Sequence, residues 1–473
     1  MKKQLLTILI AVFIYSSNAQ VTLMGLSSHG GIGNHGAIFN VTSTSTFDTL
    51  YNYNDGTNGC SPEGSMIQAT DGNFYGLTAS CGANSVGTLF RYNPNTKVIT
   101  TLVDFDSAIG GGPMGTLVQA TDGYLYGMTN SGGRYGDGTI FKCSMMGNLT
   151  VVTNFADYNG AFPLGNLVEA PDGNFYGMTR FGGAYGKGTI FKCTPSGALT
   201  LLHSFSGTDG SEPVASLTII KDSFLYGLTY NGGLYNGGVV FYCSTTGTFK
   251  MLTSLSSTTG IFPFGSFFNP KNGYLYATTS YGGSYFLGTL IRCDDSGKVV
   301  DIADFNDTNG AYPMGSLMRA SDGKLYGTTS HGGIPGVNNG VVFSYNIASQ
   351  ILSDVYQLTA LDPKNPDGDL IEISTVTTGS KTIVANKSAK IYPNPNKGQF
   401  TLDLGNNEVT INGNDNIRME VYNMLGQIVF TENMNVLQNS NAINLGSQPT
   451  GLYLYKVVSD NSGLLANGKF VIE

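Results

Sequence analysis

Aromatic side chains recur along the sequence at a spacing that suits ligand binding. They occupy three positions of a 50-residue period: Tyr135, Tyr185, Tyr235 and Tyr285; Phe181 and Tyr281; and Phe162, Phe262 and Tyr312. Aromatic rings stack on sugar rings and anchor protein partners. The alternative is that these rings pack between neighbouring repeat units. We interpret the three sets as one ligand-binding surface for a glycan or a protein.

Residues typical of catalysis or metal binding do not assemble in the same way. His29 and His331 share one repeat position and could form half of a metal site, but no acidic or cysteine ligand accompanies them. His35 and His203 each stand alone, and there is no G-x-S-x-G elbow. The sequence therefore predicts no catalytic residue, no metal and no cofactor.

Carboxylates also repeat with the turns rather than forming a non-repeating polar cluster. Aspartates of Asp-Gly or Asp-Ser turns, whose side chains satisfy the local backbone, are Asp71, Asp122, Asp172, Asp222 and Asp322. A loose calcium-like spacing at Asn365, Asp367, Asp369 and Glu372 has its glycine in the wrong place for a calcium loop. The acidic residues thus favour structural roles.

The elements that must position the aromatic residues form a unit repeated seven times. Its first glycine, or its replacement, falls at Gly25, Gly76, Gly127, Gly177, Gly227, Ala277 and Gly327. Each unit contains four short strand-forming runs, as in 125–129, 138–143, 149–155 and 163–170, separated by glycine-rich turns. This period and strand number are typical of a β-propeller blade.

The innermost strand of each blade carries a Pro-x-Gly or Pro-x-Ala motif. Six copies precede the chain's last repeat, and the seventh is Pro366-Asp367-Gly368, which leads into 371–374. We predict an all-β, seven-bladed propeller with four-stranded blades of about 50 residues, closed by this C-terminal strand in the N-terminal blade. The longer loops, which carry the aromatic residues, share one face.

The repeated residues DG-[NY]-[FL]-YG-[LM]-T and GG-x-YG-x-GT-[IL]-F-K-C resemble the GloVer (Gloeobacter–Verrucomicrobia) tandem repeat of exported bacterial proteins. The resemblance covers 21–375. It implies a propeller-type fold and brings no common catalytic residue.

The C-terminal region has a different pattern. A polar linker at 376–388 precedes three ordered motifs, which begin at Ile391, Met419 and Gly451. They resemble the type A C-terminal sorting domain of the type IX secretion system over 389–473. That resemblance implies a small β-sandwich that the outer-membrane secretion machinery recognises, and hence a secreted or cell-surface protein. Alternating strands between Gly, Asn and Pro turns favour the same fold.

The N-terminal residues 1–19 have the pattern of a signal peptide. Lys2 and Lys3 precede an apolar run, and small residues lead to a cleavage site between Ala19 and Gln20. No later run is long and apolar enough to span a membrane. The mature chain then begins with the propeller, 20–375.

Six cysteines in an exported chain suggest disulfide bonding. Cys60 and Cys81 break the repeat in loops of one blade, and we predict a disulfide between them. The other cysteines share one strand position, 50 residues apart, and are expected to pack as small apolar groups: Cys143, Cys193, Cys243 and Cys293.

The charge balance narrows the class of partner. With a net charge of −8 and only 24 Lys and Arg, the chain has no basic face for nucleic acid. We expect a non-catalytic binding module for glycan or protein that acts through its aromatic-rich loop face. Two alternatives remain: a polysaccharide hydrolase or lyase with a site in the propeller channel, and a structural surface-layer component.

Overall fold

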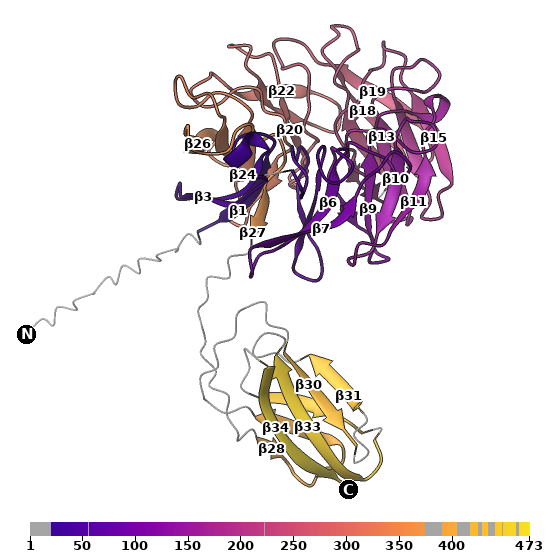
Figure 1. The fold of residues 1–473 in the computed structure, drawn as a ribbon, viewed down its shortest axis with the longest axis vertical. Helices are drawn as coiled ribbons and strands as arrows, with labels where there is room; N and C mark the ends of the chain where they lie inside the picture. Colours follow the sequence, from indigo (N-terminus) through magenta and orange to yellow (C-terminus); the bar gives the residue numbers. More distant parts are fainter. Residues whose placement is uncertain are drawn as a thin grey trace, which may run out of the picture. The chain divides into compact units, whose positions relative to one another are not determined.

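The structure is a computed structural model in which the chain divides into two compact units, Met1–Ile373 and Ser374–Glu473 (Figure 1). It describes residues 20–373 except 55 and 222, and residues 390–473 except 404–416, 424–427, 434–439, 447 and 460–462. The predicted signal peptide, with Ala19, and the linker 376–388 lie outside these residues. The described part is all-β apart from two short 3-10 turns, η1 (Ile32–Asn34) and η2 (Asp157–Asn159), and contains no helix long and apolar enough to cross a membrane.

The described strands of the first unit form seven antiparallel sheets, six of four strands and one of three. Written from the inner to the outer strand, the first four are β27 (Ile371–Ile373), β1 (Thr22–Ser27), β2 (Ala37–Thr42), β3 (Phe47–Asn52); β4 (Ile67–Gln68), β5 (Phe74–Thr78), β6 (Thr88–Asn93), β7 (Val98–Asp104); β8 (Val118–Gln119), β9 (Leu125–Thr129), β10 (Thr139–Cys143), β11 (Leu149–Asn154); and β12 (Val168–Glu169), β13 (Phe175–Thr179), β14 (Thr189–Cys193), β15 (Leu199–Ser204).

The remaining three sheets of this unit follow the same strand order. They are β16 (Thr218–Ile220), β17 (Phe224–Leu228), β18 (Val239–Ser244), β19 (Phe249–Ser254); β20 (Leu275–Thr279), β21 (Thr289–Cys293), β22 (Val299–Asp304); and β23 (Met318–Arg319), β24 (Leu325–Thr329), β25 (Val341–Asn346), β26 (Ile351–Gln357).

One predicted innermost strand is missing, because the sheet β20–β21–β22 has only an isolated bridge, Phe268 to Tyr276, in its place. The reason is Pro270. In four other sheets the equivalent residue, an alanine, donates its backbone N–H to close the turn, as Ala170 does to the carbonyl of Asn174 at 2.9 Å. Proline has no N–H to donate, so the strand pairing shortens.

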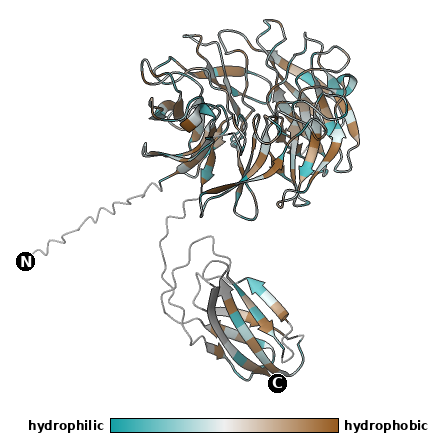
Figure 2. Ribbon diagram, in the orientation of Figure 1, coloured by the Kyte–Doolittle hydropathy of each residue, from teal (hydrophilic) through white to brown (hydrophobic). Residues whose placement is uncertain are grey.

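The sheets pack face to face, which explains why their middle strands are apolar on both sides. One core cluster combines Tyr126 of β9 with Phe175, Phe191 and Cys193 of the next sheet, and Figure 2 shows the resulting apolar bands. The four repeated cysteines are fully buried and unpaired, as the sequence predicts. Burial raises the pKa of the Cys193 thiol to about 12, so it remains protonated and inert.

A cycle of seven hydrogen bonds joins the inner ends of the sheets. At one repeat position, each residue donates its backbone N–H to a side-chain oxygen of its counterpart in the next sheet, over 2.5–2.9 Å. The cycle runs through Ser65, Thr116, Asn166, Ser216, Ser266, Ser316 and Asp369, and returns to Ser65. Every sheet of the first unit therefore contributes one link.

The glycine before this position allows the sheets to approach. A Cβ on Gly165 would lie 2.4 Å from the carbonyl oxygen of Ala215, and one on Gly368 would lie 2.2 Å from that of Gly64. The backbone of the neighbouring sheet occupies the space that a side chain would need. The repeated Pro-x-Gly motif is therefore a packing requirement.

The C-terminal end of the first unit joins its N-terminal sheet, as the sequence predicts. Strand β27 pairs antiparallel with β1, which places Ile373 opposite Thr22. Leu370 is buried in the same cluster as Leu23 and Phe39 of this sheet. Residues almost the full length of the unit apart thus share one core.

The turn aspartates also have the predicted role. Asp122 accepts the backbone N–H of Tyr124 at 3.0 Å and the hydroxyl of Tyr126 at 2.8 Å. Equivalent bonds occur at Asp71, Asp172 and Asp322, whereas Asp222 lies outside the described residues.

The described strands of the second unit form two sheets: β28 (Lys390–Tyr392), β29 (Gln399–Asp403), β32 (Ser440–Asn444); and β31 (Ile428–Asn433), β30 (Ile417–Tyr422), β33 (Gly451–Ser459), β34 (Gly463–Ile472). Side chains from both sheets, among them Phe400, Val421 and Phe470, form one hydrophobic core.

Candidate functional site

One cavity of about 370 Å³ lies where the inner ends of all seven sheets meet. Its wall includes the residue between the proline and the glycine of each Pro-x-Gly motif, or of its Pro-x-Ala variant. At this position five sheets carry apolar side chains, Met114, Leu164, Val214, Phe264 and Met314, and the two remaining, adjacent sheets carry Glu63 and Asp367. The cavity therefore has an apolar arc and an acidic wall.

The acidic wall corrects the sequence prediction that no non-repeating polar cluster exists. Asp367 accepts the Ser28 hydroxyl on Oδ2 at 2.6 Å, while its Oδ1 is buried without a hydrogen-bond partner. Burial raises the pKa of Asp367 to about 6, and burial together with Asp367 raises the pKa of Glu63. Asp369, also on this wall, has a pKa raised by burial.

An ion pair lies across the cavity from these carboxylates. Arg180 donates from Nε and Nη2 to Oε2 of Glu212 at 3.1 and 3.0 Å, and its guanidinium lies 4.9 Å from the centre of the Phe181 ring. Asn231 donates to the other Glu212 oxygen at 3.1 Å. The positive charge of Arg180 is thus neutralised within its own cluster.

Around the cavity mouth, one loop residue of every sheet has a left-handed backbone. The position holds Ser61, Gly112, Phe162, Glu212, Phe262, Tyr312 and Asn365, with φ between 51° and 60°. Glycine adopts this conformation freely, whereas bulky side chains adopt it at a cost. Phe162, Phe262 and Tyr312 occupy this position although Gly112 adopts the same backbone conformation in another sheet.

These rings belong to two groups of aromatic contacts, a chain of four rings and a separate pair. Tyr230 stacks on Phe262 at 5.1 Å between ring centres, Phe262 meets Tyr281 at 5.8 Å, and Tyr281 meets Tyr312 at 4.9 Å. Tyr312 contacts His331 at 5.6 Å, and Phe162 contacts Phe181 at 6.2 Å. We call this set, Phe162, Phe181, Tyr230, Phe262, Tyr281 and Tyr312, the aromatic band.

The structure thus brings together five of the nine aromatic residues selected from sequence. The other four, Tyr135, Tyr185, Tyr235 and Tyr285, are 54–63% exposed and do not pack between sheets. Their loops adjoin the band, because the N–H of Phe162 donates to the carbonyl of Asp137 at 2.9 Å and equivalent bonds recur at Phe262 and Tyr312. These tyrosines form an outer set on the same side as the band.

Sequence reasoning missed Arg180, Glu212, Tyr230 and the cavity carboxylates. Arg180 and Tyr230 fill a position that holds Asn130, Ser280 and Ser330 elsewhere, and Glu212 replaces an aromatic residue. Departures from the repeat at loop positions were the available signal. Glu63 and Asp367 gave the same kind of signal, because both are acidic at a position of the Pro-x-Gly motif that is apolar in the other five sheets.

The predicted cysteine pair is joined in the structure, where Cys60 and Cys81 form a disulfide with 5.3 Å between their Cα atoms. Among the described residues, the only compact group of potential metal ligands is these two sulfurs with His35. Since the sulfurs are bonded to each other, they are poor metal ligands. Gln20, after the predicted cleavage site, is exposed.

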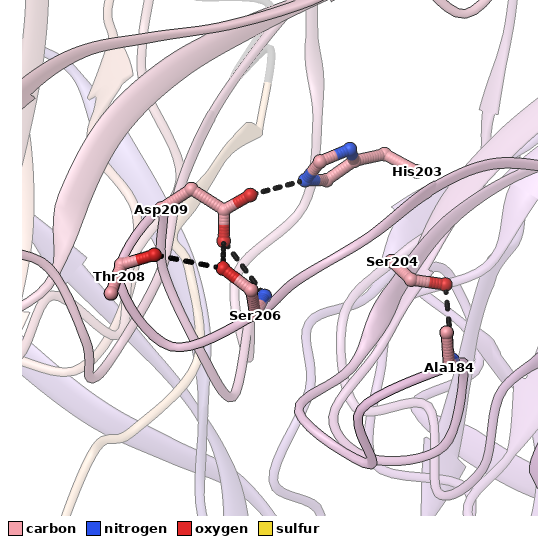
Figure 3. Close-up of polar contacts among 6 residues, drawn as sticks. All are labelled: Ala184, His203, Ser204, Ser206, Thr208 and Asp209. Carbon is pink, nitrogen blue, oxygen red and sulfur yellow. Dashed lines mark hydrogen bonds and ion pairs between the residues drawn. The ribbon is translucent and has the colours of Figure 1, made fainter.

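The histidines have local partners. His29 and His331 line one cavity of about 320 Å³ with Lys364 and Asp367, and each has its Nδ1 2.9 Å from the hydroxyl of the preceding serine. His203 Nε2 lies 3.0 Å from Asp209, whose other oxygen accepts from Ser206 (Figure 3). The Ser206 hydroxyl binds the carboxylate rather than the imidazole, so this is not the arrangement of a catalytic triad.

Comparisons with known proteins agree with this architecture. A proposed 6-phosphogluconolactonase from Bacteroides fragilis is 15% identical, with a TM-score of 0.51 over 76% of this chain and 99% of that one. A second from Bacteroides uniformis is 14% identical, with a TM-score of 0.49 over 75% and 99%. PorZ, a surface component of the type IX secretion system of Porphyromonas gingivalis, is 13% identical, with a TM-score of 0.42 over 93% and 63%. At such identities the first likeness shows a propeller-like fold alone.

No curated protein matches the chain. A family model of the Gloeobacter/Verrucomicrobia repeat matches residues 15–223 and 169–389, and a model of the secretion system C-terminal sorting domain matches 390–473. The sorting domain indicates type IX export to the cell surface or the extracellular space. The chain belongs to the Gloeobacter/Verrucomicrobia repeat family and ends in a secretion sorting domain.

Proposed function

We propose that this exported protein is a non-catalytic module that binds a glycan on the face formed by the aromatic band and the outer tyrosines. The observation that supports the proposal most strongly is the band itself. Four of its rings form a chain of contacts and two others form a pair, and three of the six residues have a left-handed backbone conformation.

The backbone conformation argues for a role of these side chains. A left-handed conformation costs a non-glycine residue roughly 1–2 kcal/mol. Phe162, Phe262 and Tyr312 therefore lower the stability of the fold relative to glycine, which Gly112 shows to be acceptable at this position. Strained residues of this kind concentrate at functional sites.

The chemistry around the band suits a sugar. Pyranose rings offer apolar C–H faces to aromatic rings and hydroxyl groups to polar neighbours. Glu212, Asn231 and Arg180 lie next to the band and supply acceptors and donors in fixed positions. The outer tyrosines extend the same surface with four further exposed rings.

The proposal includes the scaffold. We infer a seven-bladed propeller, because the hydrogen-bond cycle returns to its first residue after seven sheets. The single core between the two sheets of the second unit supports a sandwich for the sorting domain. Removal of 1–19 as a signal peptide and handling of 389–473 by the secretion machinery complete the proposed route to the cell surface.

The test uses the mature chain from residue 20 on glycan arrays and immobilised polysaccharides. The decisive variant is Phe162→Gly, Phe262→Gly and Tyr312→Gly together, since glycine removes the rings and accepts the same backbone. We expect at least about tenfold weaker binding with an equal or higher melting temperature. Replacement of Tyr135, Tyr185, Tyr235 and Tyr285 by alanine is the companion variant.

Unchanged binding in both variants would contradict the proposed face. A mature chain that binds no glycan, but captures one surface protein through the same residues, would replace the glycan by a protein ligand. Binding of neither would leave a structural surface component.

A second candidate is a polysaccharide hydrolase or lyase, which the paired carboxylates Glu63 and Asp367 in the cavity favour. A raised pKa is what a general acid needs. Turnover of a chromogenic polysaccharide that disappears in Glu63→Gln would establish this candidate, and absence of turnover on substrates that bind would exclude it.

A further inference from the structure

We propose that the cavity inside the aromatic band binds the protonated amino group of an amino sugar. This inference rests on the proposed glycan-binding function and names the sugar class. It is carried by the acidic wall of the cavity, by one carboxylate oxygen that has no partner there, and by the apolar arc opposite.

No described ion pair balances the charge of the acidic wall, and His29 favours the ionised form of Glu63 less than burial and Asp367 oppose it. Glu63, Asp367 and Asp369 come from adjacent sheets, and the described residues give none of them an ion pair. Arg180, the cation of this cavity, is bound to Glu212. Lys364 is exposed and lines the neighbouring cavity with His29 and His331.

One oxygen on this wall lacks a donor. Asp367 uses Oδ2 for the Ser28 hydroxyl, and its Oδ1 is buried with no hydrogen bond. Glu63 makes no side-chain hydrogen bond among the described contacts. A buried carboxylate without a partner is costly, so a cation that enters the cavity would relieve that cost. An ammonium group has three N–H donors, which suits several carboxylate oxygens at once.

The opposite wall suits the sugar ring that carries such an amine. Phe264 lies on the apolar arc and meets Tyr230 of the aromatic band at 5.4 Å. A ring stacked there would direct its substituents across the cavity toward Glu63 and Asp367. The volume of about 370 Å³ suits one sugar residue at the end of a chain that continues over the band.

The same arrangement disfavours acidic sugars. A uronate or sulfate in this cavity would face three carboxylates without a free cation, and like charges at close range repel strongly. The inference therefore separates three sugar classes: amino sugars with a free amine bind best, neutral sugars bind less well, and anionic sugars bind least.

The experiment compares two matched probes, a glucosamine tetramer and an N-acetylglucosamine tetramer, by calorimetry with the mature chain. They share one backbone and differ in the charge of the nitrogen. We expect the free-amine tetramer to bind about tenfold more tightly, as is typical of a charge-assisted hydrogen bond. Glu63→Gln and Asp367→Asn should each remove most of that preference by weakening binding of the free-amine tetramer.

Asp48→Asn is the matched control, because it removes the same charge from an exposed position on the outer strand β3. It should change neither affinity. Thermal melts check folding, and Glu63→Gln keeps the test valid if Asp367→Asn does not fold, since Glu63 supports no described side-chain hydrogen bond.

Equal affinity for both tetramers, or a preference that survives Glu63→Gln, overturns this inference and leaves the proposed glycan function intact. Binding of neither tetramer overturns the inference, and the glycan array then decides the proposed function separately. A lysine tetrapeptide that binds as tightly as the glucosamine tetramer overturns the assignment to a sugar.

Discussion

The three regular sheets from β8 to β19 and the junction where the ends of the first unit meet share one backbone arrangement but differ in the side chains they carry. The regular sheets place apolar side chains at the cavity, unpaired cysteines in the core and hydroxyl or amide groups in the hydrogen-bond cycle. The junction places Glu63, Asp367 and Asp369 at the same positions and adds a disulfide nearby. The repeated residues form the scaffold, and the acidic residues that depart from the repeat make one side of the cavity polar.

The largest expected effect tests whether the junction is as firmly packed as the regular sheets. Leu370 and Leu167 occupy the same repeat position and are equally buried. Replacement of either by alanine should lower the free energy of unfolding by about 2–5 kcal/mol. Chemical denaturation of both variants measures it. A negligible loss for Leu370→Ala beside a normal loss for Leu167→Ala would mean that β27 is only loosely attached.

Cysteine chemistry should differ between the two regions. Reduction of the Cys60–Cys81 disulfide, which closes a loop of 21 residues, should cost about 3 kcal/mol. A Cys60→Ala, Cys81→Ala double variant should melt at a temperature that reductant does not change. In the folded protein the four buried thiols should resist alkylation, and mass mapping that finds free thiols at residues 60 and 81 would refute the bond.

The inner glycines should tolerate change less than their single alanine counterpart. A methyl group on Gly165 meets the carbonyl of Ala215, so Gly165→Ala should destabilise by about 1–3 kcal/mol. Ala215→Gly is the matched control, with an expected change below about 1 kcal/mol. If both variants melt like the wild type, close approach of the sheets is not what requires glycine.

The smallest expected effect is a pH dependence of opposite sign in the two regions. The pKa of Asp367 is raised to about 6 by burial, so its folded state favours the protonated form and gains stability as pH falls from 7 toward the unfolded pKa. Asp367→Asn should thus be more stable than wild type at pH 7, by on the order of 1 kcal/mol, and lose this advantage by about pH 4.

Asp172 provides the contrast. Burial opposes ionisation there, but hydrogen bonds from Tyr176, Asn174 and Lys192 outweigh it and hold the pKa below its usual range. Its contribution is present above the unfolded pKa and disappears as pH falls through the folded value. Asp172→Asn should therefore melt below wild type at pH 7. Melting curves over pH 2–7 measure both variants against wild type, because the Asp172 contribution changes only below the unfolded pKa of about 4. Comparison with wild type cancels the opposing effect of His203, whose pKa burial lowers.

The sequence predicted those features of the fold that recur with the 50-residue period. The register of the repeat predicted the sheets, the inserted strand at 371–373, the buried cysteines and the turn aspartates. It did not predict the loss of an inner strand at Pro270. Proline removes one backbone N–H there, but the spacing of apolar residues, on which the prediction rested, is unchanged. Nor did the sequence bring Glu63 and Asp367 to one cavity, although both occupy the repeated Pro-x-Gly position, because the spacing does not show that the inner ends of the sheets enclose a cavity.

The sequence also did not predict the loop position near the cavity at which every sheet has a left-handed backbone. Phenylalanine, glutamate, tyrosine, serine and asparagine share it with a single glycine, so no residue type marks it. The aromatic residues were found by their spacing, whereas their contacts with Tyr230 and Arg180 depend on how adjacent sheets are arranged.

The pairing of β27 with β1 has a consequence for folding kinetics. Its partner residues, Thr22 and Ile373, are separated by nearly the whole unit, so the pairing closes a very long loop and has a high contact order. During synthesis or export, the first sheet remains without its inner strand until residue 373 has emerged. Completion of the first sheet is therefore among the last steps in the folding of the first unit.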